Sequence, residues 1–188
     1  MREIGLLVRK NLIHRSTLSA GNIGTKADLK FGDMTKIPWW IQPEVDILVT
    51  AAAMLSELYH RDGRGLILDR APKDKLILTC RFAAVLTASI LKSKGIPTAV
   101  RSGHASYFKD ETGEVIPSVA WDHWLNQYWN NEQNRWITID VDGSLSLGED
   151  FDPYDIPFGK FDFPADSWIN ARSGKVNPDK FHNAGGQQ

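Results

Sequence analysis

The segment TCRFAAVLTASILKSKG, residues 79–95, contains the only cysteine of the chain. Apolar residues recur in it at the three-and-four spacing of a buried helical stripe. They are Ala83, Ala84, Leu86, Thr87, Ile90 and Leu91. Thr79 can cap the helix start, Gly95 can take the left-handed position after its end, and Pro97 forbids continuation. The pattern predicts a helix whose first turn carries Cys80.

A cysteine in the first turn of a helix lies among unpaired N–H groups at the positive end of the helix dipole, which favours the thiolate. Arg81 adds a positive charge beside Cys80. Nucleophilic thiols are found in such positions, although a lone cysteine is more often a small buried apolar residue. A catalytic interpretation therefore requires a base and an orienting group from elsewhere in the chain.

The composition fits one soluble domain spanning residues 1–188, with 42% hydrophobic and 24% charged residues. A net charge of -1 and the lack of a Lys/Arg run argue against nucleic acid as a partner. A single cysteine excludes an internal disulfide and suits the cytoplasm. Because no apolar run reaches the length of a signal-peptide core or a membrane span, we expect a cytoplasmic protein without a membrane partner.

Residues 1–78 read as a helical N-terminal part. A short helix is indicated near the N-terminus by Ile4, Leu7, Val8 and Leu12. A second helix is predicted from Pro43, which suits a first turn, and ends at Gly63 and Gly65. Its apolar face comprises Val45, Leu48, Ala51, Ala52, Leu55, Leu58 and Tyr59. Residues 66–78 are expected to connect this helix to the one that carries Cys80.

After residue 97 the hydrophobic period changes from 3.6 to 2, which indicates strands. Strands are predicted over residues 98–108, 119–129 and 135–141, with the polar run 130–134 joining the last two. Residues 164–172 read as a last short helix, and residues 175–188 as a tail. Helices followed by neighbouring strands predict an α+β fold with helices packed on an antiparallel sheet.

The predicted hairpin offers Cys80 a base. If the turn is centred between Asn131 and Glu132, His123 falls directly opposite Asp140, with Cβ atoms about 4.5–5.5 Å apart. On the third strand Asp140 faces away from the aliphatic row, which is formed by Ile137, Ile139 and Val141. A slip of one residue would place His123 and Asp140 on opposite faces. Of the remaining histidines, His14, His60, His104 and His182, none receives a role.

The order Cys80, His123, Asp140 resembles the transglutaminase-like superfamily, whose fold is related to that of papain-like cysteine proteases. Three pieces carry the resemblance, which is strongest over residues 79–142. They are the Cys80 helix with the following Gly95-Ile96-Pro97-Thr98-Ala99-Val100-Arg101, the segment Asp122-His123-Trp124, and the segment Trp136-Ile137-Thr138-Ile139-Asp140. Residues 101–108 and 168–174 further resemble a bacterial subgroup of this superfamily.

The resemblance implies a transglutaminase-like core and a Cys–His–Asp triad. Cys80 would attack a carboxamide or ester carbonyl, His123 would take the thiol proton and later protonate the leaving amine, and Asp140 would fix the imidazole tautomer. The Cys80 backbone N–H would hold part of the oxyanion. The second donor is expected from an upstream side chain, for which the candidates are Trp39, Trp40 and Gln42.

Two further residues are candidates for substrate binding. The hairpin carries Trp121, Trp124, Trp129 and Trp136. They form either an aromatic wall for a substrate or ordinary sheet packing, and packing is preferred for Trp124 and Trp129. Trp121 therefore remains a candidate. Arg101 either binds a substrate carboxylate or pairs with a neighbouring Asp.

The sequence thus predicts a cysteine-dependent acyl-transfer enzyme acting on a peptide or small amide, with hydrolysis favoured over transamidation because nothing marks an amine-acceptor site. The acidic stretch after Asp140 lacks EF-hand spacing, and one cysteine with scattered histidines lacks zinc-ligand spacing. Neither a metal nor another cofactor is therefore expected. Arylamine acetyltransferases use the same order of residues, but no coenzyme A signal is present. The alternative is a catalytically inactive binding or scaffold domain on the same fold.

Overall fold

The computed structural model describes residues 1–14, 47–108, 115, 118–142 and 151–183. Its α-helices are α1 (Arg2–Asn11), α4 (Ala51–Arg61), α5 (Cys80–Ser93) and α6 (Pro164–Arg172). Two short 3₁₀ helices are η3 (Pro72–Asp74) and η4 (Pro178–Lys180). The strands are β1 (Leu12–His14), β2 (Leu76–Leu78), β3 (Thr98–Ala105), β4 (Ala120–Asn130), β5 (Arg135–Ile139), β6 (Phe161–Asp162) and β7 (Phe181–His182).

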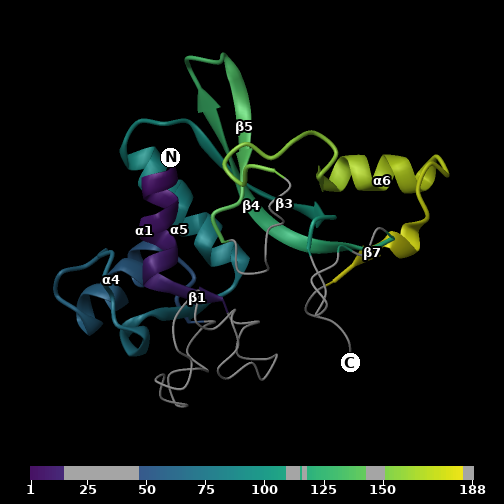
Figure 1. The fold of residues 1–188 in the computed structure, drawn as a ribbon. Coiled ribbons are helices and arrows are strands. Elements are labelled where there is room, and N and C mark those ends of the chain that lie inside the picture. Colours follow the sequence, from purple (N-terminus) through teal and green to yellow (C-terminus); the bar gives the residue numbers. More distant parts are fainter. Residues whose placement is uncertain (15–46, 109–114, 116–117, 143–150, 184–188) are drawn as a thin grey trace.

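The main sheet has the strand order β5-β4-β3-β6, with antiparallel pairs throughout, and β7 adds a short parallel pair to β4. Helices α1 and α4 contact α5, and α5 packs across β3 and β4. Figure 1 shows these three helices gathered beside the sheet, with α6 near its other end. The described chain is therefore α+β with helices on a mainly antiparallel sheet, as the sequence predicted.

Apolar side chains form two clusters on opposite faces of the hairpin, because successive side chains of a strand point to opposite faces. The helix-side core contains Val8, Met54, Leu58, Leu76, Leu78, Phe82, Leu86, Ile137, Ile139 and Val141, among others. The aromatic cluster on the other face contains Ala105, Tyr107, Phe108, Leu125, Ile156 and Phe161. The aliphatic row that the sequence predicted on the third strand thus lies in the helix-side core.

Helix α5 begins and ends as the sequence predicted. Gly95 adopts a left-handed backbone with φ of 75°, and its N–H donates to the Lys92 carbonyl at 2.9 Å. The N–H of Ile96 reaches back to the Leu91 carbonyl at 3.0 Å. These two bonds form a Schellman motif, which satisfies the last carbonyls of the helix and requires a residue that tolerates positive φ.

A second, two-stranded sheet was not predicted. β1 pairs with β2 in parallel, and His14 lies opposite Leu78. The buried Asn11 stabilises this arrangement, because its Nδ2 donates to the carbonyls of Leu7 at 2.7 Å and Ile67 at 2.8 Å, while its Oδ1 accepts from Arg70 Nε at 2.7 Å. The end of α1 is thereby tied to the segment that enters β2.

The helix predicted from Pro43 onward is wrong in part. Residues 47–50 are not helical, and α4 begins at Ala51 because Thr50 is its N-cap and accepts the Ala53 N–H at 3.1 Å. Tyr59, predicted on the buried face, is 56% exposed. The residues that α4 buries are Met54 and Leu58. Pro43 and Val45 lie outside the described residues.

The turn between β4 and β5 differs from the predicted one. Asn130 Oδ1 accepts the N–H groups of Glu132 at 2.9 Å and Gln133 at 3.1 Å, and Asn134 has a left-handed φ of 49°. The loop therefore takes four residues, 131–134, and Trp129 pairs with Trp136. The predicted register is wrong by two residues, so His123 and Asp140 are not directly opposite. An even shift keeps both on the predicted face.

Candidate active site

Cys80 is the first residue of α5, directly after β2, and it is half-buried. Thr79 is the N-cap residue, as predicted, but its hydroxyl makes no capping hydrogen bond. The Cys80 N–H instead donates to Nε2 of His14 at 3.0 Å. The first free amide of the helix is thus satisfied by a side chain from β1, a contact that no local sequence pattern predicts.

His123 and Asp140 meet at the end of the β4–β5 ladder. The distance from His123 Nε2 to Asp140 Oδ2 is 2.8 Å, and the two residues are only 4% and 3% exposed. Asp140 follows the last residue of β5, so the pair forms although neither residue belongs to a β4–β5 partner pair. With Nε2 bound to the carboxylate, Nδ1 is the ring nitrogen left for the thiol.

The Asp140 carboxylate has two further donors. The Tyr107 hydroxyl donates to Oδ2 at 2.9 Å, and the Asp142 N–H donates to Oδ1 at 3.1 Å. Tyr107 is buried, and together with Phe108 it packs edge-on against the His123 ring. Sequence reasoning missed Tyr107; the available signal was its place just beyond β3, the strand that pairs with the histidine strand.

The charges around the thiol favour its ionised form. Burial raises the pKa of Cys80, but hydrogen bonds from His123 and His14 outweigh burial and bring this pKa to about 7. Burial lowers the pKa of His123, but the charge and hydrogen bond of Asp140 outweigh it, so this pKa lies well above its usual value. Burial beside Asp140 raises the pKa of Tyr107, which keeps its hydroxyl protonated as a donor.

His14 is a second histidine at the thiol. Its place follows from the parallel β1–β2 pairing, which puts the end of β1 next to the start of α5. Its Nε2 lies 3.3 Å from Asp142 Oδ2, and the two side chains are only 11% and 9% exposed. Neither residue was singled out from the sequence, because no local pattern links two three-residue strands so far apart in the chain.

The remaining candidates are three residues that the structure does not describe and two that it places away from Cys80. Trp39, Trp40 and Gln42 fall outside the described residues. Trp121 packs beside the aromatic cluster, with its ring centroid 5.2 Å from that of His182. The Arg101 guanidinium lies 4.7 Å from the centroid of Phe163, and within the described residues it forms no ion pair with an Asp.

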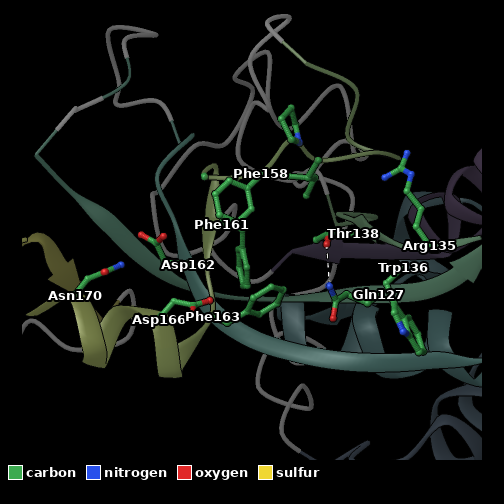
Figure 2. Close-up of a pocket in the computed structure, with 13 residues that line it drawn as sticks. Gln127, Arg135, Trp136, Thr138, Phe158, Phe161, Asp162, Phe163, Asp166 and Asn170 are labelled. Atoms are coloured by element: carbon green, nitrogen blue, oxygen red, sulfur yellow. Dashed lines mark hydrogen bonds between the residues drawn. The ribbon is translucent and has the colours of Figure 1, made fainter. Parts of the chain in front are cut away.

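A cavity of about 560 Å³ lies beside the hairpin and the start of α6. Figure 2 shows Phe158, Phe161 and Phe163 along it, and the Gln127 side chain donating to Thr138 Oγ1, a bond of 3.1 Å. None of the three triad candidates lines this cavity. Trp129 and Trp136 stack edge-on with centroids 5.8 Å apart, which is the packing role preferred for Trp129.

Comparisons with known proteins add no assignment: no family model, no curated protein and no solved structure matches the chain. Across the described residues, no group of three or more His, Cys, Asp or Glu side chains is arranged to hold a metal ion. No helix in the same part of the chain has both the length and the apolar character that crossing a membrane requires.

Proposed function

We propose that the protein is a cysteine-dependent acyl-transfer enzyme of transglutaminase-like type, with Cys80 as nucleophile, His123 as base and Asp140 as orienting group. The observation that carries the proposal is the buried His123–Asp140 hydrogen bond of 2.8 Å beside a helix-start thiol whose pKa is lowered to about 7, chiefly by His123 and His14. A thiol, an imidazole and a carboxylate in this order are the parts of a nucleophilic triad.

In the proposed reaction, the Cys80 thiolate attacks the carbonyl carbon of an amide, a C–S bond forms, and the carbonyl π pair moves to oxygen. The oxyanion collapses, the C–N bond breaks, and the leaving amine takes its proton from the His123 imidazolium. Water then attacks the thioester while His123 takes a proton from it, and cleavage of the C–S bond restores the thiolate and the imidazolium. The product is a carboxylic acid.

Hydrolysis remains favoured over transfer to an amine, because no described residue marks an acceptor site beside Cys80. The substrate class is a peptide or a small amide. Trp39, Trp40 and Gln42 remain candidates for the second oxyanion donor.

The test is the pH dependence of Cys80 alkylation by iodoacetamide, which reads one thiol because the chain has one cysteine. We expect the rate to rise with a midpoint near pH 7, because the pKa of Cys80 is about 7. In His123→Ala the midpoint should move above the free-cysteine value of about 8.5, since burial that raises this pKa remains while the imidazole is gone.

His104→Gln is the matched control, because His104 lies on β3 bonded to Ser167 at 3.0 Å, away from the thiol. Its profile should follow the wild type. An inert thiol, or a midpoint that ignores His123, favours the inactive scaffold domain instead. A positive result justifies a screen of peptides and amides for acid and amine release.

A further inference from the structure

Within the part of the chain that the structure describes, Nε2 of His14 lies close to one hydrogen-bond donor and one acceptor, which require opposite protonation of this nitrogen. Nε2 lies 3.0 Å from the Cys80 backbone nitrogen and 3.3 Å from Asp142 Oδ2. The backbone N–H is a donor and requires a lone pair on Nε2, whereas the carboxylate is an acceptor and requires a proton there. A neutral or a charged imidazole satisfies one partner at a time. The arrangement therefore has two states that differ by one proton.

The two states differ in what they leave to a substrate. While Nε2 accepts the Cys80 N–H, it occupies the position from which an oxyanion would accept the same hydrogen bond. A proton on Nε2 removes that acceptor and makes Asp142 the preferred partner of the imidazole. The Cys80 N–H is then free to stabilise negative charge on the carbonyl oxygen.

We propose that His14 and Asp142 form a second histidine–carboxylate pair at the thiol, which gates the oxyanion donor of Cys80 according to the proton on His14 Nε2. Neutral His14 holds the backbone N–H, and protonated His14 releases it to the substrate. This inference rests on the proposed acyl-transfer function and adds a control over the same site.

The groups that face His14 set the direction of the gate. Among the residues that the structure describes, they are Asp142 from the segment after β5, Cys80 from α5 and His123 from β4, whereas β2 carries only Leu76, Ile77 and Leu78. Burial lowers the pKa of His14 and His123 also lowers it, but Asp142 and Cys80 outweigh both, so this pKa is raised. The gate is therefore open at lower pH and closes as pH rises through the raised pKa.

As pH rises, ionisation of the thiol should speed acylation, whereas closing of the gate should slow it. Two probes separate these effects. Iodoacetamide loses iodide when the thiolate attacks its methylene carbon, so no oxyanion forms. The ester p-nitrophenyl acetate loses p-nitrophenolate only after its carbonyl oxygen has carried the charge. With the full-length protein, we expect alkylation to rise with pH to a plateau, and acylation to rise and then fall about tenfold per pH unit once His14 is neutral.

Two substitutions should shift the alkaline fall of acylation in opposite directions. His14→Ala leaves the Cys80 N–H free at every pH, so the fall should vanish, while the alkylation midpoint rises only modestly through loss of the His14 hydrogen bond. Asp142→Asn removes the charge that raises the pKa of His14, so the fall should begin at lower pH. His104→Gln, which removes a histidine bonded to Ser167, should keep the wild-type profile.

The outcomes separate this proposal from the function on which it rests. Normal alkylation with no acylation, in wild type and His14→Ala alike, counts against acyl transfer. Acylation with the same pH profile in wild type and His14→Ala overturns the gate alone. Should His14→Ala fail to fold, nitrogen-15 spectra of the wild type decide: the Cys80 amide resonance should shift at the pH where His14 Nε2 gains its proton, and an amide that ignores this titration overturns the gate.

Discussion

Two histidine–carboxylate pairs flank Cys80, and they differ in how firmly their protons are placed. In the pair of His123 and Asp140, the carboxylate accepts hydrogen bonds from His123, Tyr107 and the Asp142 N–H, and the Nε2–Oδ2 distance is 2.8 Å. In the pair of His14 and Asp142, the distance is 3.3 Å and the same nitrogen also accepts an amide N–H. The first pair is suited to hold one tautomer, and the second is suited to switch between two states.

The difference follows from the elements that carry the two pairs. His123 lies within an eleven-residue strand and packs edge-on against the rings of Tyr107 and Phe108, with centroids 6.5 and 4.9 Å away. His14 ends a three-residue strand, and Asp142 follows the end of β5. A long strand with aromatic neighbours restricts an imidazole more than the end of a short one does.

The largest effect should come from Asp140→Asn. The carboxylate accepts from His123 and Tyr107 on one oxygen and from the Asp142 N–H on the other, and an amide has only one acceptor oxygen. Loss of the charge also lowers the pKa of His123 and raises that of Cys80. Since the corresponding change in a serine triad lowers kcat about 10⁴-fold, we expect acylation by p-nitrophenyl acetate to fall about 10²-fold or more.

Asp142→Asn is the comparison for this prediction, because it removes a carboxylate from the other pair. At a pH below the alkaline fall of both the wild type and Asp142→Asn, this substitution should change the acylation rate far less than Asp140→Asn does. Equal losses of acylation rate in the two variants would contradict the separate roles of the two histidine–carboxylate pairs.

The parts of the fold that local patterns determine were predictable. The span of α5 follows from its helical spacing and from Gly95 after its end, and the start of α6 follows from Pro164 at its first position. The β4–β5 register could not be predicted, because it depends on a turn in which the Asn130 side chain accepts two backbone N–H groups and Asn134 has a left-handed backbone. The place of His14 beside Cys80 could not be predicted for another reason. The parallel β1–β2 pair joins segments far apart in the chain, and only the folded chain brings them together.

A smaller effect is expected from Tyr107→Phe, which tests how the pair of His123 and Asp140 is positioned. The buried hydroxyl donates to Asp140 at 2.9 Å, and hydrogen bonds to charged groups contribute about 1.5–3 kcal/mol. We expect the free energy of unfolding in urea to fall by about that amount. The carboxylate then acts on His123 with one donor fewer, so the midpoint of Cys80 alkylation should move slightly below pH 7.

The shift in the alkylation midpoint separates a positioning role for Tyr107 from simple packing. Tyr107→Phe keeps the ring and its edge-on contacts with Phe108 and Phe151, so a purely structural residue would lower stability without moving the pH profile. An unchanged midpoint would show that Tyr107 does not position the pair of His123 and Asp140.

The smallest effect should come from Arg101→Ala, which tests whether a charge outside both histidine–carboxylate pairs acts on Cys80. Arg101 lies over Phe163, a residue that lines the cavity of about 560 Å³, and the lining of this cavity includes neither histidine pair. Arg81, in contrast, directly follows the thiol in the chain. Iodoacetate is an anion and iodoacetamide is neutral, so the ratio of their rates reports positive charge near Cys80. Arg101→Ala should change this ratio about twofold or less, because solvent and salt screen a charge so placed, whereas Arg81→Ala should lower it clearly. A large fall in Arg101→Ala would place its guanidinium within reach of the thiol and return it to the set of residues that bind a substrate carboxylate.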